Sequence, residues 1–290
     1  NLYQLPPLDF IKGGYVKFRW SLAELDLYWT LSPEEMKLLR NKTGATRLGF
    51  AVLMKFFQQE CRFPETPREI PAAAINHIAL QTEVPFQKWQ AYRWEGRTIK
   101  YHRAKIREWF GYREANRTDV NQLKIWLIQQ VLDHEHRMDR LQEAILDQCR
   151  VLGIEPPASE QIRRLIRSAA QNHENHFCNG IFQRLDLSMP EQWDALIAVK
   201  QLEDDETGWS IWQDLKAEPG KAGLESVKKA ASRLRLIREL TFPTDLYNDV
   251  PPKLVERFAK RAAVEEPFEL RRHAEPLKLT LMSAFLHRRK

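Results

Sequence analysis

Apolar residues recur every three or four positions along most of this 290-residue chain, which is the period of an amphipathic α-helix. The best-marked helix runs over about 33–41, because Ser32 suits its N-cap and Glu35 completes a capping box. After a turn at 42–45, helical spacing resumes and continues from Leu48 to about Cys61. A helix, a short turn and a second helix are therefore predicted in succession.

The same spacing predicts further helices, which span about 68–81, 84–92, 98–110, 118–131, 138–152 and 224–240, begin near 159 and 252, and end with 277–290. Gly111 and Gly153 mark helix ends, and Ser159 suits the N-cap of a long basic helix after the connector 154–158. An exposed acidic loop is expected at 203–208 and a connector at 219–223. Strand patterns are nearly absent, apart from a weak one at 15–18, so the predicted fold class is all-α.

Composition adds a basic balance to this helical pattern. Hydrophobic residues make up 43% and charged residues 29% of the chain, as in ordinary soluble proteins. The net charge of +6 and the pI of about 9.2 favour a polyanionic partner. No segment has the ~20 apolar residues that span a bilayer, and three scattered cysteines indicate no disulfide framework. We expect a cytoplasmic protein with no membrane partner.

The clearest candidate binding site follows the turn at 95–96. A helix that follows a short helix and a glycine turn has the position of a recognition helix in helix-turn-helix units. The start of this helix is rich in side chains that contact phosphates or base edges, so we predict DNA contacts from Arg93, Arg97, Thr98, Lys100, Tyr101, His102, Arg103 and Arg107. The alternative is that these cations only solvate the outer face of the helix.

A second candidate lies at the start of the long basic helix. A capped helix N-terminus favours phosphate, and planar side chains there can reach bases, so we predict contacts from Ser159, Gln161, Arg163, Arg164 and Arg167. A third basic stretch at 228–238 is dispersed around its helix and is interpreted as a solvated face.

No pattern in the chain predicts catalysis. The stretch 173–176 (HENH) has one residue too few between Glu174 and His176 for a zinc-protease motif, so no metal site is assigned. Glycine-rich phosphate loops, nucleophile elbows and dinucleotide fingerprints are also missing from the sequence. An enzyme that uses the residues from His173 to Cys178 stays a minor alternative.

Several ordered stretches resemble the amino-terminal half of the Tn-three family of replicative transposases, a region of the type called domain of unknown function 4158. The resemblance covers about residues 25–290 and rests on 28–35 (YWTLSPEE), 47–51 (RLGFA), 96–98 (GRT) with His102, Arg103, Ile106 and Arg107, 110–113 (FGYR), 214–221 (DLKAEPGK), 269–273 (ELRRH) and 276–286 (PLKLTLMSAFL).

The resemblance implies sequence-specific binding of double-stranded DNA at the terminal inverted repeats of a transposon, with self-association in a transpososome, in a bacterial, nucleoid-associated protein. It implies no cofactor in this region, and an RNase-H-like Asp-Asp-Glu domain that uses Mg²⁺ in a part of the protein after Lys290. The expected helix at 277–290 has no stop residue, which also favours a continuing chain.

Together these observations divide the chain into three parts. We expect a first helical DNA-binding domain at 1–115, a second at 116–212 and a helical linker or scaffold region at 213–290. The main alternative function is a helical scaffold or oligomerisation module of a mobile-element protein that does not read bases.

Overall fold

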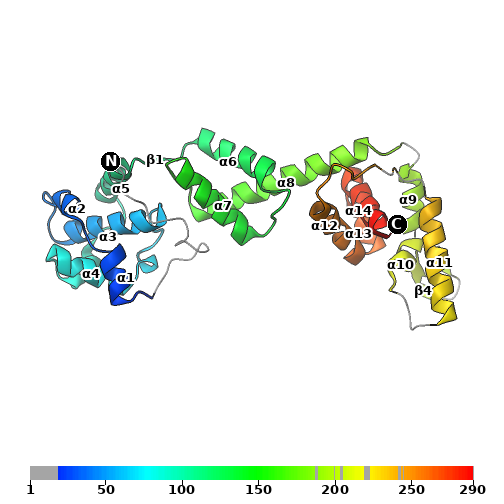
Figure 1. The fold of residues 1–290 in the computed structure, drawn as a ribbon, viewed down its shortest axis with the longest axis horizontal. Coiled ribbons are helices and arrows are strands. Elements are labelled where there is room, and N and C mark those ends of the chain that lie inside the picture. The colour runs from blue at the N-terminus through cyan, green and yellow to red at the C-terminus, as the bar shows by residue number, and fades with distance from the viewer. Residues whose placement is uncertain are drawn as a thin grey trace. The chain divides into compact units, whose positions relative to one another are not determined.

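The computed structural model describes residues 19–186, 189–198, 200–202, 205–218, 223–240, 243 and 245–289. These residues are predominantly helical, so the predicted all-α class is confirmed. The chain divides into two compact units, one formed by Asn1–Leu127 with Glu135–Arg167 and the other by Ile128–His134 with Ser168–Lys290 (Figure 1). No described helix is long and apolar enough to cross a membrane.

Seven α-helices of the described residues lie wholly or, in the case of α6, mostly in the first unit. They are α1 (Leu22–Tyr28), α2 (Pro33–Lys37), α3 (Gly44–Glu60), α4 (Ala72–Thr82), α5 (Arg97–Phe110), α6 (Arg117–Gln130) and α7 (Met138–Val151). Two 3₁₀ segments, η2 (Pro67–Glu69) and η3 (Phe86–Ala91), flank α4. The short strands β1 (Arg113–Glu114) and β2 (Ile154–Glu155) pair in parallel.

Helix α8 (Ser159–Gln183) begins in the first unit and ends in the second. The later elements are α9 (Met189–Ile197), β3 (Lys200–Leu202), β4 (Asp205–Trp209), α10 (Ile211–Lys216), α11 (Leu224–Glu239), α12 (Pro252–Val264), α13 (Pro267–Arg272) and α14 (Glu275–Arg289). Strands β3 and β4 form an antiparallel pair, in which Lys200 lies opposite Trp209.

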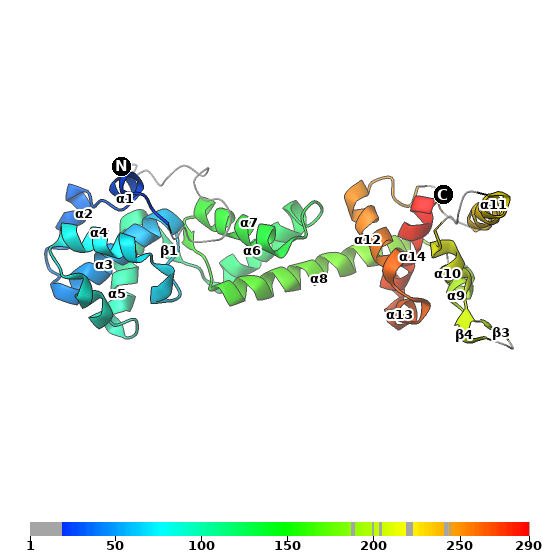
Figure 2. The ribbon, with the colours of Figure 1, turned by 90° about the horizontal axis from the view of Figure 1, so that it is seen from below.

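Helix α3 is the centre of the first core. It buries Phe50, Phe56 and Phe57 almost completely and contacts α4, η3 and α5, and Figure 2 shows α4 and α5 beside it. Gly49 on α3 lies directly against the ring of Tyr92, and a Cβ added there would come within 2.1 Å of that ring. No larger residue fits this position without moving the tyrosine.

The predicted capping box at the start of α2 is confirmed, and its acid has a second partner. The Ser32 hydroxyl accepts from the Glu35 N–H, and the Glu35 carboxylate accepts from the Ser32 N–H. The same carboxylate lies 3.4 Å from Lys55 Nζ on α3, and both side chains are buried. Burial lowers the pKa of Lys55, which the charge of Glu35 opposes. The pair ties α2 to the core helix.

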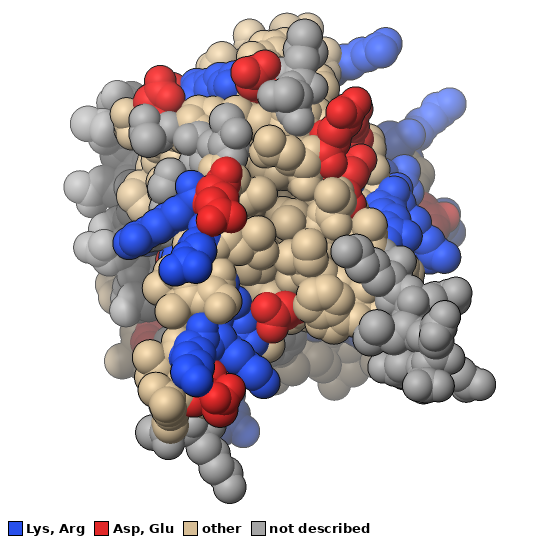
Figure 3. Space-filling model, turned by 90° about the vertical axis from the view of Figure 1, so that its right-hand side faces the viewer, with Lys and Arg blue, Asp and Glu red and all other residues tan. Residues whose placement is uncertain are grey.

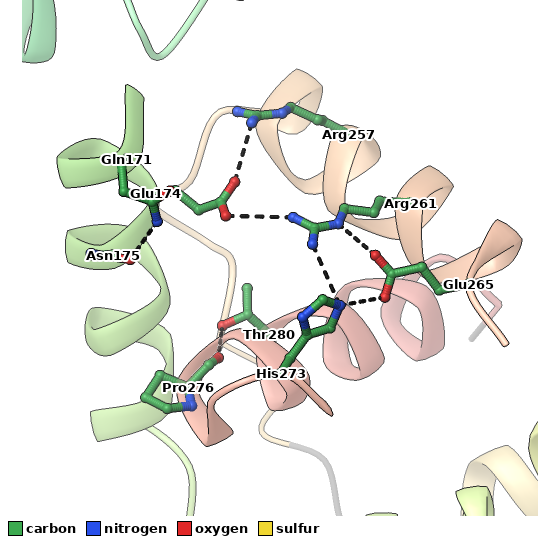
Figure 4. Close-up of polar contacts among 9 residues, drawn as sticks. All are labelled: Gln171, Glu174, Asn175, Arg257, Arg261, Glu265, His273, Pro276 and Thr280. Atoms are coloured by element: carbon green, nitrogen blue, oxygen red, sulfur yellow. Dashed lines mark hydrogen bonds and ion pairs between the residues drawn. The ribbon is translucent and has the colours of Figure 1, made fainter. Parts of the chain in front are cut away.

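In the second unit the core lies between α12 and α14, where Phe258, Leu279 and Met282 are buried. A chain of charged side chains joins α8 to α12 (Figure 4). Glu174 accepts hydrogen bonds from Arg257 at 3.3 Å and from Arg261 at 3.4 Å. Arg261 also donates to Glu265 at 2.7 Å, and the other oxygen of Glu265 lies 2.7 Å from His273 Nε2.

Four local predictions were wrong. The helix expected at about 33–41 ends already at Lys37, and turns follow it at 38–41. The helix expected at 68–81 starts only at Ala72, because Pro67 begins a separate 3₁₀ turn and Pro71 occupies the N-cap of α4. The helix expected at 84–92 is the 3₁₀ segment η3. Part of the expected acidic loop, Asp205–Trp209, is the strand β4.

Some predictions fall on residues that the structure does not describe, and some helices of the structure were not predicted. The expected strand at 15–18, Glu203 and Asp204, and connector residues 219–222 lie outside the described residues. Four short helices, α1, α9, α10 and α13, were not predicted. The division into three domains stays a prediction.

Candidate nucleic-acid interface

Helix α5 exposes one face at the candidate site because it packs the opposite face against the core. Ile99, His102 and Ile106 are spaced by three and four positions and are buried. Gly96 precedes the helix with a positive φ of 94°, and Gly111 ends it in the left-handed conformation, as predicted. These two glycines set the length of the helix that carries the candidate residues.

Exposed cations gather at the amino-terminal end of α5. Arg93, Arg97, Thr98 and Lys100 are all exposed there, and Tyr101 follows them with 51% of its surface accessible. Among the described residues, no carboxylate forms an ion pair with the three cations. The first turn of α5 contains no acidic residue, and Gly96 offers no side-chain cap. This positive charge adds to the positive end of the helix dipole, so the surface attracts anions.

His102 lies in the core and not on this surface, although the sequence predicted that it contacts DNA. It is 3% exposed, its Nδ1 lies 2.9 Å from the Tyr92 hydroxyl, and its ring stacks on the ring of Tyr92. Burial lowers the pKa of His102 to about 4, so the ring is neutral near pH 7. Its role is to hold α5 against the segment that precedes it.

Arg103 and Arg107 are half-buried and engaged with the protein itself. Arg103 donates to the carbonyl oxygen of Pro64 at 3.3 Å, and its guanidinium lies over the ring of Phe63. Arg107 forms an ion pair with Glu155 of β2 and lies 3.4 Å from Glu114. Both arginines therefore attach α5 to neighbouring segments of the first unit.

The second candidate site, at the start of α8, already contains an anionic side chain. Helix α8 starts at Ser159, so the N-cap is Ala158 and not Ser159. The Ser159 N–H donates to Glu65 Oε1 at 2.8 Å. Hydrogen bonds from Ser159 lower the pKa of Glu65. A carboxylate of the protein therefore occupies the position at which phosphate was expected.

The remaining residues of this second site face outward. Gln161, Arg163, Arg164 and Arg167 are all exposed. Glu160 lies 3.8 Å from Arg163 and 3.3 Å from Arg164, and such exposed pairs add little stability. These side chains can therefore turn toward a ligand at low energetic cost.

Residues of the stretch at 173–176 make contacts inside the second unit. His173 Nε2 lies 2.8 Å from Asp133 Oδ1, while Glu174 pairs with two arginines of α12. Within the described residues, no three His, Cys, Asp or Glu side chains come together as a metal site. The three cysteines are free and buried.

The fold and the exposed cations define a helical protein with a basic surface on its first unit. Residues 14–169 match the family described as Domain of unknown function (DUF4158). This match covers more than half of the chain, so the protein belongs to that family. The domain is found in transposase-like proteins, and the matched residues end close to the boundary of the first unit at Arg167.

Proposed function

We propose that the first unit binds double-stranded DNA through the amino-terminal end of α5, and that the chain recognises the terminal inverted repeats of a transposon as part of a replicative transposase. The observation that carries this proposal is the group of Arg93, Arg97 and Lys100, which are exposed and have no carboxylate partner among the described residues. Elsewhere on this chain many exposed cations pair with acids, whereas these three form no ion pair within the described residues, not even with the neighbouring Glu95.

The dimensions of α5 support a groove-binding role. An α-helix is about 10–12 Å wide with its side chains, and the major groove of DNA is about 12 Å wide. Arg97 lies in the first turn, from which recognition helices contact bases, and its planar guanidinium matches the acceptors of guanine. Arg93 and Lys100 flank it as phosphate contacts. Arg163, Arg164 and Arg167 supply a second cationic group on the same unit, with the neutral Gln161 beside them.

The proposal assigns binding alone to these residues. Cutting and joining of DNA, with Mg²⁺, belongs in this proposal to an RNase-H-like domain of the parent transposase. Self-association in a transpososome and a place on the bacterial nucleoid are parts of the same proposal.

The test is a fluorescence-anisotropy titration of the full chain with the inverted repeat of its own element and with a shuffled duplex of equal composition. Arg97→Ala should weaken binding to the repeat by about 5- to 150-fold and bring the two affinities closer, because a base contact is lost. Arg164→Ala should weaken both duplexes alike. Arg140→Ala, which removes an exposed cation paired with Glu143, is the matched control.

The affinities of the wild-type protein for the two duplexes are compared first. If it binds the repeat and the shuffled duplex with equal affinity, specific recognition is excluded. If Arg97→Ala and Arg140→Ala have equal effects, α5 is not the reading helix.

A second candidate function, a helical scaffold, is favoured by α11. Leu224, Val227 and Leu234 on this helix are 70%, 64% and 45% exposed, at spacings of three and seven positions. Figure 3 faces the end of the second unit where α9, α10 and α11 lie in Figure 1, and there acidic and basic side chains surround uncharged surface. A solution mass above the 34.3 kDa of one chain, reduced by Val227→Asp, would support this function.

A further inference from the structure

A groove separates the turn between α2 and α3 from the exposed face of α5. Its volume is about 660 Å³, within the range of small-molecule and cofactor sites. Aromatic and cationic side chains dominate its lining, and Glu108 is the single acid among the described residues that line it. Aromatic rings beside cations are the combination with which proteins hold single-stranded nucleic acid.

The aromatic part of the groove comes from α5 and α3. Tyr101 projects from α5 with half of its surface exposed, and Trp109 lies two turns further along the same helix. Phe50 of α3, a core residue, also lines the groove. A half-exposed tyrosine ring leaves one face open to stack on a planar ligand.

Four described cations line the groove, Lys37, Arg40, Lys42 and Lys105, and of these Lys42 is fixed while Arg40 is free of ion pairs with described residues. Lys42 Nζ donates to the carbonyl oxygen of Leu38 at 2.7 Å and lies 4.2 Å from the centre of the Phe50 ring. Burial lowers the pKa of Lys42. Arg40 is exposed, and no carboxylate of the described chain forms an ion pair with it. Arg40 is therefore the cation best placed to receive a phosphate.

The cation on the α5 side of the groove, Lys105, is held by an exposed ion pair. Lys105 of α5 pairs with Glu108 at 2.7 Å, and its side chain is half-exposed. A surface pair of this kind contributes little, about 0.2–1 kcal/mol, so the ammonium can leave it for a phosphate. The groove thus offers a stacking ring together with two groups that can bind phosphate.

We propose that this groove binds an unpaired nucleotide of a DNA strand, with the base on the Tyr101 ring and the adjoining phosphates on Arg40 and Lys105. A paired base inside a duplex shows no free face to a tyrosine ring, so the ligand must be single-stranded, bulged or at an open end. The inference takes its DNA ligand from the proposed function, and the groove adjoins the Arg97 surface, because Tyr101 follows Arg97 by one helical turn on α5.

The test is a titration of the full chain with a fluorescent oligothymidylate, with the inverted-repeat and shuffled duplexes measured in parallel. Tyr101→Ala should weaken oligothymidylate binding about tenfold or more, because base stacking is lost. Tyr101→Phe should restore it, since the ring and not the hydroxyl is required. Arg40→Ala should weaken it and reduce its dependence on salt. Thermal melting confirms that each variant is folded.

The results separate two proposals, nucleotide binding in the groove and duplex recognition by the amino-terminal end of α5. The groove proposal is overturned if Tyr101→Ala binds oligothymidylate as tightly as the wild type, or if the wild type binds only duplex. Oligothymidylate binding that depends on the Tyr101 ring, without a preference for the repeat, keeps the groove proposal and removes specific duplex recognition. Failure to bind any of the three DNAs overturns both.

Discussion

His102 and Tyr92 show how a single polar contact orients the candidate DNA surface. Their rings stack, and the Tyr92 hydroxyl lies 2.9 Å from His102 Nδ1. Gly49 leaves the space that Tyr92 occupies. The cluster therefore links α3 to α5 through residues that never meet the solvent, and it fixes how far the exposed face of α5 stands from the core.

This cluster predicts a pH dependence of stability. The pKa of His102 is about 4 in the folded protein and close to 6.5 in an unfolded chain. Between these values the unfolded state binds a proton that the native state does not, so stability must fall as the pH is lowered from 6.5 to 4. Urea midpoints measured at pH 7 and pH 5 test this, and the lower pH should give the lower midpoint.

The matched variant is His102→Gln, which retains a polar group beside Tyr92 but cannot titrate. Its midpoint should be lower than that of the wild type at pH 7 and should change less between pH 7 and pH 5. An equal change in both proteins would assign the pH dependence to other groups.

The candidate residues of α5 show what sequence can and cannot predict. Gly96 and Gly111 bounded the helix correctly, because glycine has a specific backbone role at each position. The core position of His102 was also available from its spacing to Ile99 and Ile106. By contrast, Arg107 meets Glu155 through a contact across 48 positions, which no local pattern contains. The sequence did not single out the groove residue Arg40, because several of the residues that line the groove with it come from α5, which lies far away in the sequence.

At the scale of elements, the start of α8 depends on a side chain from a distant segment. Glu65 accepts from the Ser159 N–H and places a negative charge at the positive end of the helix. Sequence favoured phosphate at this position, because a helix start reveals the need for an anion but not which group supplies it. Glu65 lies 94 positions before Ser159, beyond the reach of any capping pattern.

Glu65→Gln should therefore destabilise the first unit. Loss of the charge at this helix end should reduce the free energy of unfolding by about 0.3–1 kcal/mol, measured by urea denaturation at pH 7. Because the folded pKa of Glu65 is lowered, its contribution is present above the ordinary glutamate pKa and is lost as the pH falls through the lowered value.

The control for this element is Glu143→Gln, which removes an acid paired with the exposed Arg140 on α7. A surface pair contributes little, so its effect should be smaller than that of Glu65→Gln. Equal effects would mean that the carboxylate does not stabilise α8 through its amino-terminal end.

At the scale of the whole molecule, the net charge of +6 does not distinguish the cations that pair with acids from the cations that do not. Many arginines pair with acids, as Arg184 does with Asp249 at 2.6 Å and Arg113 with Asp119 at 2.5 Å. Hydrogen bonding to Arg113 lowers the pKa of Asp119 to about 2, which keeps that pair charged over the working pH range. Only the cations without such partners fully displace the counterions of DNA when they contact its phosphates.

The salt dependence of DNA binding measures how many of these unpaired cations contact phosphates. The logarithm of the affinity should fall linearly with the logarithm of salt concentration, with a slope of about −0.9 for each phosphate contact. Lys100→Ala should make the slope shallower by about one contact, whereas Lys260→Ala, paired with Glu256 in the second unit, should leave it unchanged. An affinity insensitive to salt in the wild type would contradict a phosphate-binding surface.

The uncapped start of α5 has a consequence for protein engineering. Adding an acid to its first turn, for example by Thr98→Asp, follows the usual rules for a more stable helix. The same acid would stand beside Arg97 and weaken the positive field that the proposed DNA binding requires at this end of the helix. If the proposal holds, variants selected for thermal resistance alone would tend to lose DNA binding, while selection for tight DNA binding should keep this turn free of acids.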